Sequence, residues 1–514
     1  MIFSSWPFIF VFLPLTALGF FAIPLRFRAA RKIWLTLASL VFYAYWKIEY
    51  VPLIVFSILF NYAIAEALLR FHARRAAWWI LCGGVGTNLA LLGYFKYANF
   101  LVQSLGLATG HASAHLDIIL PLAISFFTFT QIAYLVDVYR DEARHYSFLD
   151  YSLFVVFFPH LIAGPIVRHW EIIPQYADKD IRANREDISV GLAIFLLGLY
   201  KKLLLADNIS GVANAVFGAA ERGGALTWFD AWFGALAYSM QLYFDFSGYS
   251  DMAIGLARMF SIRFPLNFNS PYQASSIPEF WRRWHVTLTR FLREYFYYPM
   301  GGNRCGKVRH ALNIFLTMLV SGLWHGAGWT FVAWGALHGA YLLIATQWQH
   351  FWDARGWRRD HWLWRGAMVV VTFLAVLVGW VVFRAVSFEG AGRMLATMAG
   401  MHGLTVPFNV GEAQLGVGKL AALVGATIVP EGVAGMSYRW TLPGLMLLLV
   451  ACWALPNTQE WLRDYQPVLE KISVTRAFRL RIGFVTGLIL GLPFFAVVKA
   501  FVGSQPSPFL YFNF

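Results

Sequence analysis

The first residue that could carry chemistry is His325, in the segment SGLWHGAGW (321–329) of a long apolar run. An ionisable side chain at membrane depth is costly, so it is a candidate functional residue. Gly322 and Gly326 have GxxxG spacing, which lets another helix approach closely beside His325. Two interpretations stay open: a neutral histidine hydrogen-bonded across a helix contact, or a base in a protected cavity. Two neighbours would line such a cavity, Trp324 and Ser321, although nothing in the sequence activates the Ser321 hydroxyl as a nucleophile.

His338 lies further along the same apolar run. On a continuous helix it would be about 220° around the axis from His325, so the two could not hold one metal on a shared face. We therefore interpret His338 as structural.

Another histidine, His285, lies in the segment 277–302, which is patterned as one amphipathic helix. At about 100° per residue its arginines gather on one face and its large apolar side chains on the opposite face, with His285 at the edge of the apolar stripe. Such a helix lies in the membrane interface. Two interpretations stay open. The helix anchors the protein at the membrane surface and His285 has no function, or its arginines hold a polyanion such as a cofactor's phosphates while His285 points into the protein. The candidate phosphate-binding residues are Arg282, Arg283, Arg290 and Arg293.

Two carboxylates occur in the apolar segment YFDFSGYSD (243–251), Asp245 and Asp251. Acids in such a run need partners, which could be the intramembrane pair Lys201-Lys202 or the arginine face. We expect a structural role for both acids. The alternative is that they line a cavity, and the candidates for lining from this segment are Asp245 and Tyr249.

The composition is that of an integral membrane protein. Of 514 residues, 59% are hydrophobic and only 13% are charged, whereas soluble domains are nearer a quarter charged. The net charge of +14 comes from basic residues scattered between apolar runs. In a membrane protein such residues set the topology and contact anionic lipid headgroups. The charge therefore does not indicate nucleic-acid binding. The three cysteines, Cys82, Cys305 and Cys452, are far apart, so we expect neither a disulfide framework nor a metal site.

Apolar runs of about 20 residues predict transmembrane helices. We expect about 11–14 transmembrane or re-entrant helices, with residues 6–24 as the first span and not a removed signal peptide. The candidate spans are 7–24, 33–46, 51–68, 77–94, 118–138, 152–167, 188–206, 228–258, 311–345, 366–384, 441–455 and 482–502. The runs 228–258 and 311–345 are long enough that each could be two spans. We find no repeat or linker, so one polytopic domain, 1–514, is the simplest organisation.

Basic residues after the first, third and fifth spans place those loops in the cytoplasm and the N-terminus outside. A single crossing at 152–167 would then put the basic stretch 168–185 outside. A re-entrant segment, broken at Pro159 and at Gly164-Pro165, would enter and leave the membrane on the same side and so keep this stretch in the cytoplasm. Re-entrant backbone must be buried in protein or line a water-filled cavity. His160, on this segment, is therefore interpreted as packing or as lining a site.

Three long segments resemble the membrane-bound O-acyltransferase family: QLYFDFSGYSDMAIGLA (241–257), FNSPYQASSIPEFWRRWHVTLTRFLREYFYYPMGGNR (268–304) and FLTMLVSGLWHGAGWTFVAWGALHG (315–339). The bacterial polysaccharide-acetylation branch, of alginate O-acetyltransferase type, is the most similar. Further agreement comes from 93–100, 120–140, 158–166 and the closing SPFLYFNF (507–514). The resemblance is dense from about 90 to 340. It is sparse from 345 to 506, within the C-terminal helices, 345–514.

The resemblance implies an all-α fold in which many helices surround a central tunnel, with interfacial amphipathic helices. The family's principal histidine falls on His325, as catalytic base, and its second histidine on His285. The acyl donor would be cytoplasmic acetyl-CoA, with no metal. The partner would be a periplasmic SGNH-type acetyltransferase or another polysaccharide-modification protein. The protein would be located in the bacterial inner membrane.

The acceptor stays open. The expected function is O-acetylation of an exported, alginate-type polysaccharide, and a sibling acyltransferase for peptidoglycan, cellulose or teichoic acid is the alternative. From other classes, a transporter would show two related halves with matching broken helices, which we do not find. A scaffold for the acetylation machinery would not need His325.

Overall fold

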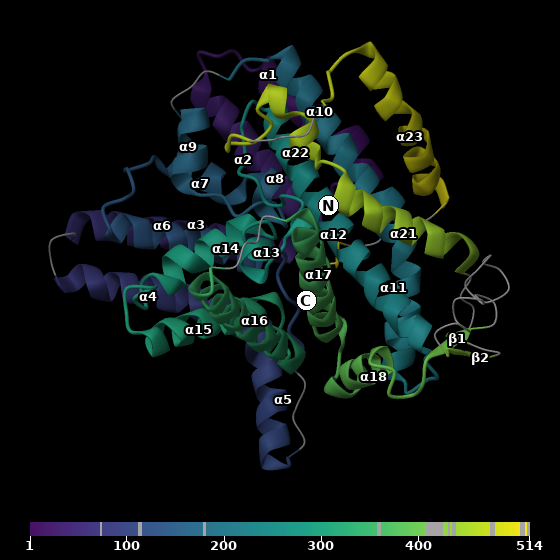
Figure 1. The fold of residues 1–514 in the computed structure, drawn as a ribbon. Coiled ribbons are helices and arrows are strands. Elements are labelled where there is room, and N and C mark those ends of the chain that lie inside the picture. Colours follow the sequence, from purple (N-terminus) through teal and green to yellow (C-terminus); the bar gives the residue numbers. More distant parts are fainter. Residues whose placement is uncertain are drawn as a thin grey trace. The chain divides into compact units, whose positions relative to one another are not determined.

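Helices form almost all of the regular structure in the described part of the chain (Figure 1). The computed structural model describes residues 1–71, 75–111, 116–177, 181–356, 361–407, 425–429, 432–433, 438–472, 479–503 and 509–510. Its described strands are β1 (Thr405–Pro407) and β2 (Thr427–Val429), which pair in parallel with Thr405 opposite Thr427.

The chain forms two compact units that alternate along the sequence. The first comprises Met1–Tyr200, Tyr249–Asn267 and Thr458–Asn513; the second comprises Lys201–Gly248, Phe268–Asn457 and Phe514. Helix α12 (Trp228–Met259) contributes residues to both units. The expectation of one domain over 1–514 stays a prediction.

The first unit has helices at both ends of the sequence. They are η1 (Phe8–Phe12), α1 (Leu13–Ala22), α2 (Arg28–Ala44), η2 (Ile48–Tyr50), α3 (Val51–Phe71), α4 (Arg75–Leu92), η3 (Gly93–Tyr97), α5 (Ala98–Thr109), α6 (Ile124–Tyr139), α7 (Phe148–Val156), α8 (Phe158–Leu161), α9 (His169–Ala177), α10 (Arg185–Tyr200), α22 (Thr458–Trp461), η7 (Arg463–Tyr465) and α23 (Phe484–Gly503).

The second unit contains both principal histidines. Besides the strands its elements are η4 (Lys201–Ala206), α11 (Asp207–Glu221), η5 (Pro271–Gln273), α13 (Ile277–Trp281), α14 (Val286–Leu292), η6 (Arg293–Tyr297), α15 (Lys307–His325), α16 (Trp329–Ala354), α17 (Trp362–Arg384), α18 (Phe388–Met398) and α21 (Tyr438–Ala454).

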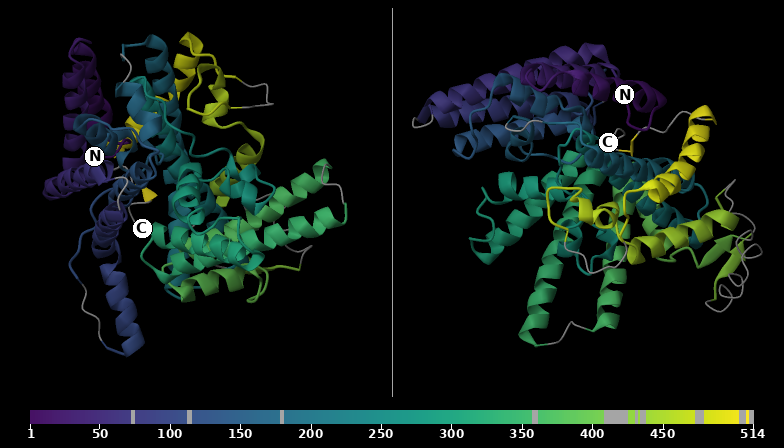
Figure 2. Two further views of the ribbon diagram at one scale, coloured as in Figure 1. Left: turned by 90° about the vertical axis from the view of Figure 1, so that its left-hand side faces the viewer. Right: turned by 90° about the horizontal axis from the view of Figure 1, so that it is seen from above.

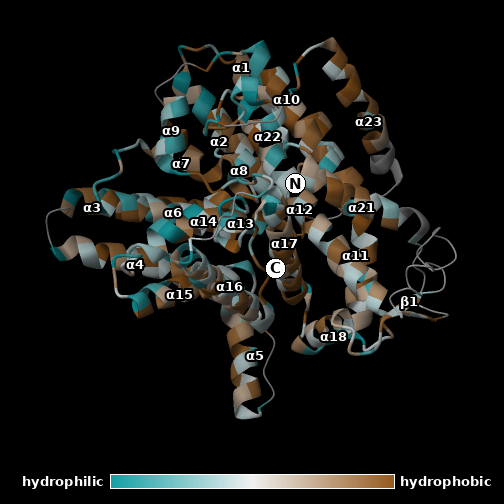
Figure 3. Cartoon of the chain, viewed as in Figure 1, coloured by the Kyte–Doolittle hydropathy of each residue, from teal (hydrophilic) through white to brown (hydrophobic). Residues whose placement is uncertain are grey.

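Five helical stretches among the described residues are long and apolar enough to cross a membrane. They are Ile48–Phe71, Arg75–Thr109, Arg185–Glu221, Trp329–Ala354 and Trp362–Arg384. Figure 3 shows how strongly apolar residues dominate α17 and α23. The transmembrane helices predicted from the apolar runs and the all-α fold class that the resemblance implies are confirmed; the central tunnel stays a prediction.

The candidate span 152–167 is not one helix. Helix α7 ends at Val156, Phe157 leaves the helical conformation with ψ 109°, and α8 has only four residues before the chain turns at Gly164. Pro159 sits in the first turn of α8, where its missing N–H is tolerated. Nine residues of α7 rise only about 13 Å, well short of a bilayer core, so neither piece spans by itself.

The long run 311–345 forms two helices, α15 and α16, and the chain turns between them at Gly326–Gly328. The two pack side by side (Figure 1). The close approach predicted from the GxxxG spacing is confirmed, because a Cβ on Gly322 would lie 2.2 Å from the carbonyl oxygen of Phe331. The continuous helix assumed for His338 is wrong: glycines with extended backbone end α15 and begin α16.

Candidate functional site

His325 is the last residue of α15 and is buried in an aromatic enclosure. Its ring lies edge-on to Trp324, Trp334 and Phe383, with centroids 5.0, 5.1 and 5.3 Å away. Phe383 comes from α17, which packs beside α16 (Figure 2). Three elements therefore fix this imidazole. Since α15 ends here, its carbonyl end directs negative potential toward the ring.

His285 is fully buried and has a left-handed backbone, with φ 42° and ψ 53°. This conformation is rare for a residue with a Cβ and persists only where packing enforces it. Phe246 of α12 lies edge-on to the ring at 4.8 Å. Burial lowers the pKa of His285 to about 3, so its imidazole is neutral at physiological pH.

The two predicted histidines lie together in the second unit, with ring centroids 6.5 Å apart. Trp324 lies beside both rings, 5.9 Å from His285. Ser321 is one turn before His325 on α15 and is also buried. Trp324 and Ser321 thus lie close to His325, and their lining role, like the catalytic roles of the histidines, stays a prediction.

The single amphipathic helix predicted for 277–302 is wrong. Helix α13 ends at Trp281, the chain turns through Arg282–Trp284, and α14 begins only after His285. The left-handed residue changes the chain direction, so the arginines do not share one face. Sequence periodicity cannot reveal such a break, because nothing in the residue type of His285 demands it.

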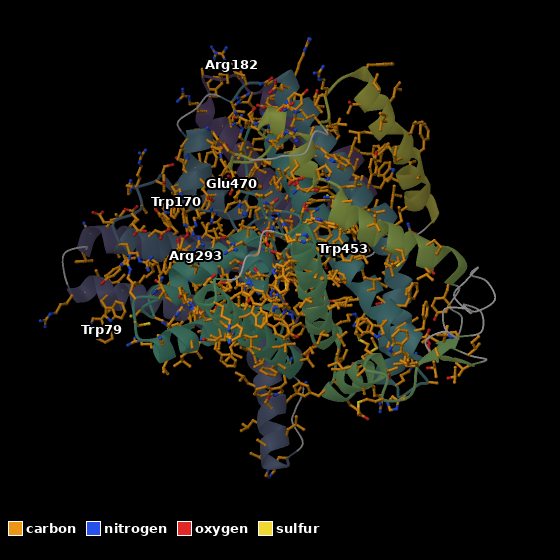
Figure 4. All side chains as sticks on the ribbon, in the orientation of Figure 1. Trp79, Trp170, Arg182, Arg293, Trp453 and Glu470 are labelled. Carbon is orange, nitrogen blue, oxygen red and sulfur yellow. The ribbon has the colours of Figure 1, made fainter. Side chains whose placement is uncertain are left out.

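The four candidate arginines have different surroundings. Arg283 donates to Glu279 at 3.0 Å and to the carbonyl of Asn269 at 3.1 Å. Arg282 is exposed, Arg290 is half-buried on α14, and Arg293 is exposed on η6 (labelled in Figure 4). The Arg283 guanidinium stabilises the α13 turn, and Arg293 lines a cavity of the second unit.

The acids of α12 are paired, as the structural interpretation predicted. Asp245 forms an ion pair with Lys202 at 2.7 Å, and Lys202 also contacts Asp207 at 2.7 Å. In the first unit, Asp251 accepts hydrogen bonds from Thr458 at 2.7 Å and Gln459 at 2.5 Å. The sequence thus offered the correct partner for Asp245, in the pair Lys201-Lys202. The partners of Asp251 are some 200 residues away in the sequence.

The other two lining candidates lie in the first unit. His160 is buried, and its Nε2 is 2.8 Å from the carbonyl oxygen of Phe154. Tyr249 stacks on Phe3 and Phe509, each with a ring-centroid distance of 4.7 Å. These contacts are packing contacts within the first unit, whereas the two principal histidines belong to the second unit.

Sequence reasoning missed the aromatic residues that hold the histidines, Phe246, Trp334 and Phe383. Phe246 and Trp334 lie inside the quoted motifs, so their position beside the histidines was an available signal; Phe383, in the sparse C-terminal region, had none. No cluster of three metal-ligating side chains occurs within the described ranges.

Comparison with known proteins decides the family. The profile of the membrane-bound O-acyltransferase family matches residues 138–378. A peptidoglycan O-acetyltransferase of Helicobacter pylori is 39% identical, covering 100% of this chain and 98% of its own length. The chain is a membrane-bound O-acyltransferase.

Other relatives of this acyltransferase have different named substrates. A probable alginate O-acetylase of Azotobacter vinelandii is also 39% identical, over the full length of both chains. A teichoic acid D-alanyltransferase of Streptococcus thermophilus is 26% identical over 44% of this chain. The resemblance predicted from the motifs is confirmed, and the protein is a multi-pass membrane enzyme that transfers an acyl group to oxygen.

Proposed function

We propose that this acyltransferase takes acetyl from cytoplasmic acetyl-CoA across the inner membrane for O-acetylation of an exported polysaccharide. The observation that carries the proposal is the buried pair His285–His325 in a chain whose full-length relatives are named O-acetyltransferase and O-acetylase. A periplasmic SGNH-type acetyltransferase or similar modification protein would complete the transfer to polymer.

His325 acts as the base. It takes the proton of the acceptor hydroxyl as the oxygen bonds to the acetyl carbon; the carbon–sulfur bond breaks, and the proton returns to the departing thiolate. Such catalysis contributes about 10²–10⁴-fold. The imidazolium formed in between lies at the negative end of α15, which stabilises it by roughly 0.3–1 kcal/mol.

His285 orients the reactants as a neutral imidazole. With a pKa of about 3 it is a poor base, but it can donate one hydrogen bond and accept another. The aromatic walls exclude water, which protects the thioester from hydrolysis. The Ser321 hydroxyl near His325 has no hydrogen-bond partner among the described residues that would activate it as a nucleophile. This favours direct transfer over an acyl-enzyme.

The alginate-type and peptidoglycan acceptors are equally supported by identity, at 39% each. We favour an alginate-type exopolysaccharide because several relatives from Azotobacter and Pseudomonas are named alginate O-acetylases.

The test is transfer of labelled acetyl from acetyl-CoA into polymer-linked ester, using membranes of the producing organism. Four samples are compared: the gene deleted, the gene restored, His325→Ala, and His402→Ala, which changes an exposed histidine. Label should appear with the restored chain and with His402→Ala only. Equal label with His325→Ala at equal protein level would contradict the proposal.

A further inference from the structure

An apolar groove of about 660 Å³ lies within the first unit, where α23 packs beside α10. Residues of η1 and α1, of α10 and of α23 form its walls. Among the described lining residues two carry a hydroxyl, Ser189 and Thr486. The Thr486 hydroxyl donates to the carbonyl oxygen of Arg481 in its own segment, so it adds no free polar group to the groove.

Glycines leave the α23 wall of the groove without side chains. Gly483, just before α23, and Gly487 and Gly491 recur at every fourth position and so lie along one face of the helix. Such a face usually lets a second helix approach closely, yet a Cβ on any of the three would meet nothing within 4 Å. Elsewhere on α23, Phe484 and Leu492 are largely exposed, as expected of a helix that faces lipid.

The groove is about as long as one leaflet of a bilayer is deep. From Ile482 to Phe494, the first and last lining residues of this segment, the helix rises about 18 Å. A hydrocarbon core about 30 Å thick gives each leaflet about 15 Å. The lining residues Leu192 and Gly487 are exposed, so the groove opens at the surface of the unit. Its length and its apolar walls match an acyl chain of a membrane lipid.

Arginines lie at the ends of the two helical segments that form the groove. Arg185 begins α10, one turn before the lining residue Ser189, and Arg481 directly precedes the lining residue Ile482. Arg182, labelled in Figure 4, lies shortly before α10. All three arginines are exposed, and none of them forms an ion pair with another described residue.

The starts of both helices lie at the same end of the groove (Figure 1). Tyr200, the last residue of α10, donates its hydroxyl to the carbonyl oxygen of Leu490, well along α23. The acids that follow Arg185 are occupied, because Arg258 lies 2.7 Å from Asp187 and 4.0 Å from Glu186. This end of the groove is therefore positively charged.

The same end lies beside the loop that follows the first helices of the chain. Arg31, at the start of α2, donates to the carbonyl oxygen of Ile181. The basic residues of that loop predict that it is cytoplasmic, and the cytoplasmic leaflet is the one whose surface is negative because of its anionic lipids. An anionic headgroup at the arginines and an acyl chain in the groove complement both parts of the surface.

We propose that this groove is a binding site for an anionic phospholipid of the cytoplasmic leaflet. One acyl chain lies along the glycine face of α23, beside α10, and the phosphate contacts Arg185 and Arg481 with Arg182 nearby. Arginine favours this contact because its planar guanidinium forms paired hydrogen bonds with phosphate oxygens. The lipid stabilises the packing of α23 on α10 and takes no part in acetyl transfer, so the proposal does not depend on the proposed function.

The unfolding temperature of the purified full-length protein in detergent tests the headgroup. The additions are phosphatidylglycerol, the zwitterionic phosphatidylcholine with the same chains, and glycerol 3-phosphate, which has a phosphate and no acyl chain. Phosphatidylglycerol should raise the unfolding temperature by about 2–5 °C, and the other two by less than about 1 °C. Arg185→Gln and Arg481→Gln should each reduce the shift to about half, whereas Arg144→Gln, an exposed arginine outside the groove, should keep it.

A groove-filling variant tests the acyl chain. Gly487→Leu places a side chain where the lipid chain would lie, and no protein atom opposes its Cβ. Native mass spectrometry should find one phosphatidylglycerol fewer on this variant than on wild type, and the lipid should no longer raise its unfolding temperature. Gly444→Leu on α21, equally unobstructed and outside the groove, should behave as wild type.

Three outcomes would overturn the proposal. Equal shifts with phosphatidylglycerol and phosphatidylcholine would show that the arginines do not select an anionic headgroup. A shift with glycerol 3-phosphate alone would indicate an anion site without a lipid. A wild-type response of Gly487→Leu would place the acyl chain elsewhere. If Gly487→Leu does not fold, the two arginine variants decide, because they change exposed side chains.

Discussion

At the scale of single residues, the two buried histidines have different parts in the proposed reaction. A base must gain and lose a proton near neutral pH, and a pKa of about 3 prevents His285 from doing so. His325 is the last residue of α15, where the carbonyl end of a helix favours a cation.

The buried neutral His285 predicts acid sensitivity. The pKa of this residue is about 3 in the fold and about 6.5 in the unfolded chain, so the unfolded state binds the proton first. Its contribution to stability is therefore complete above pH 6.5 and falls as pH drops toward 3, by about 2 kcal/mol at pH 5. The unfolding temperature of purified wild type should drop more between pH 7.5 and 5 than that of His285→Gln. Parallel curves would contradict this account.

At the scale of elements, the glycine contact between α15 and α16 holds the base in position. A Cβ on Gly335 would lie 2.4 Å from the carbonyl oxygen of Met318, and backbone cannot yield easily there. Gly335→Ala should destabilise the protein by about 1–3 kcal/mol and reduce acetyl transfer. Gly366→Ala on α17, where the new methyl meets nothing within 4 Å, is the control, and thermal unfolding with matched activity assays tests the pair.

A buried ion cluster joins η4 to α12. Lys202 lies between Asp207 and Asp245, and its side chain is 3% exposed. Removing the cation takes a close ion-pair partner from the buried Asp245 and from the half-buried Asp207. Lys202→Met should therefore destabilise the protein by about 3–5 kcal/mol, seen as loss of folded protein in detergent. Replacing the exposed Lys471 by methionine should have little effect. If Lys202→Met folds as well as Lys471→Met, the cluster does not stabilise the second unit.

These elements show what the sequence could predict. Apolar runs located most of the helices, and GxxxG spacing located the close contact beside His325, because both depend on local pattern. Tertiary packing decides what the local pattern could not predict: the break at His285, the turn at Gly326–Gly328 and the partners of Asp251. At the first two positions it overrides helical periodicity. The long motifs identified both histidines but not Phe383, which packing alone brings to the ring.

At the scale of the whole molecule, the open question is how the chain crosses the membrane around α7 and α8. Basic loops predict that residues before and after 152–167 share the cytoplasmic side, and two helices of nine and four residues are too short to span. A re-entrant segment satisfies both observations, provided that protein buries its backbone. Its residues are indeed buried throughout 152–167.

Single cysteines test this topology. In a chain whose native cysteines are replaced, cysteines are introduced at the exposed positions Glu142 and Asn184, with Ala30 as a cytoplasmic reference. A membrane-impermeant thiol reagent should leave all three unlabelled in intact spheroplasts and label all three after permeabilisation. Labelling of Asn184→Cys alone in intact spheroplasts would show that 152–167 crosses the membrane. The basic stretch 168–185 would then lie outside the cytoplasm, and the distribution of basic residues would no longer predict the orientation of the chain after residue 167.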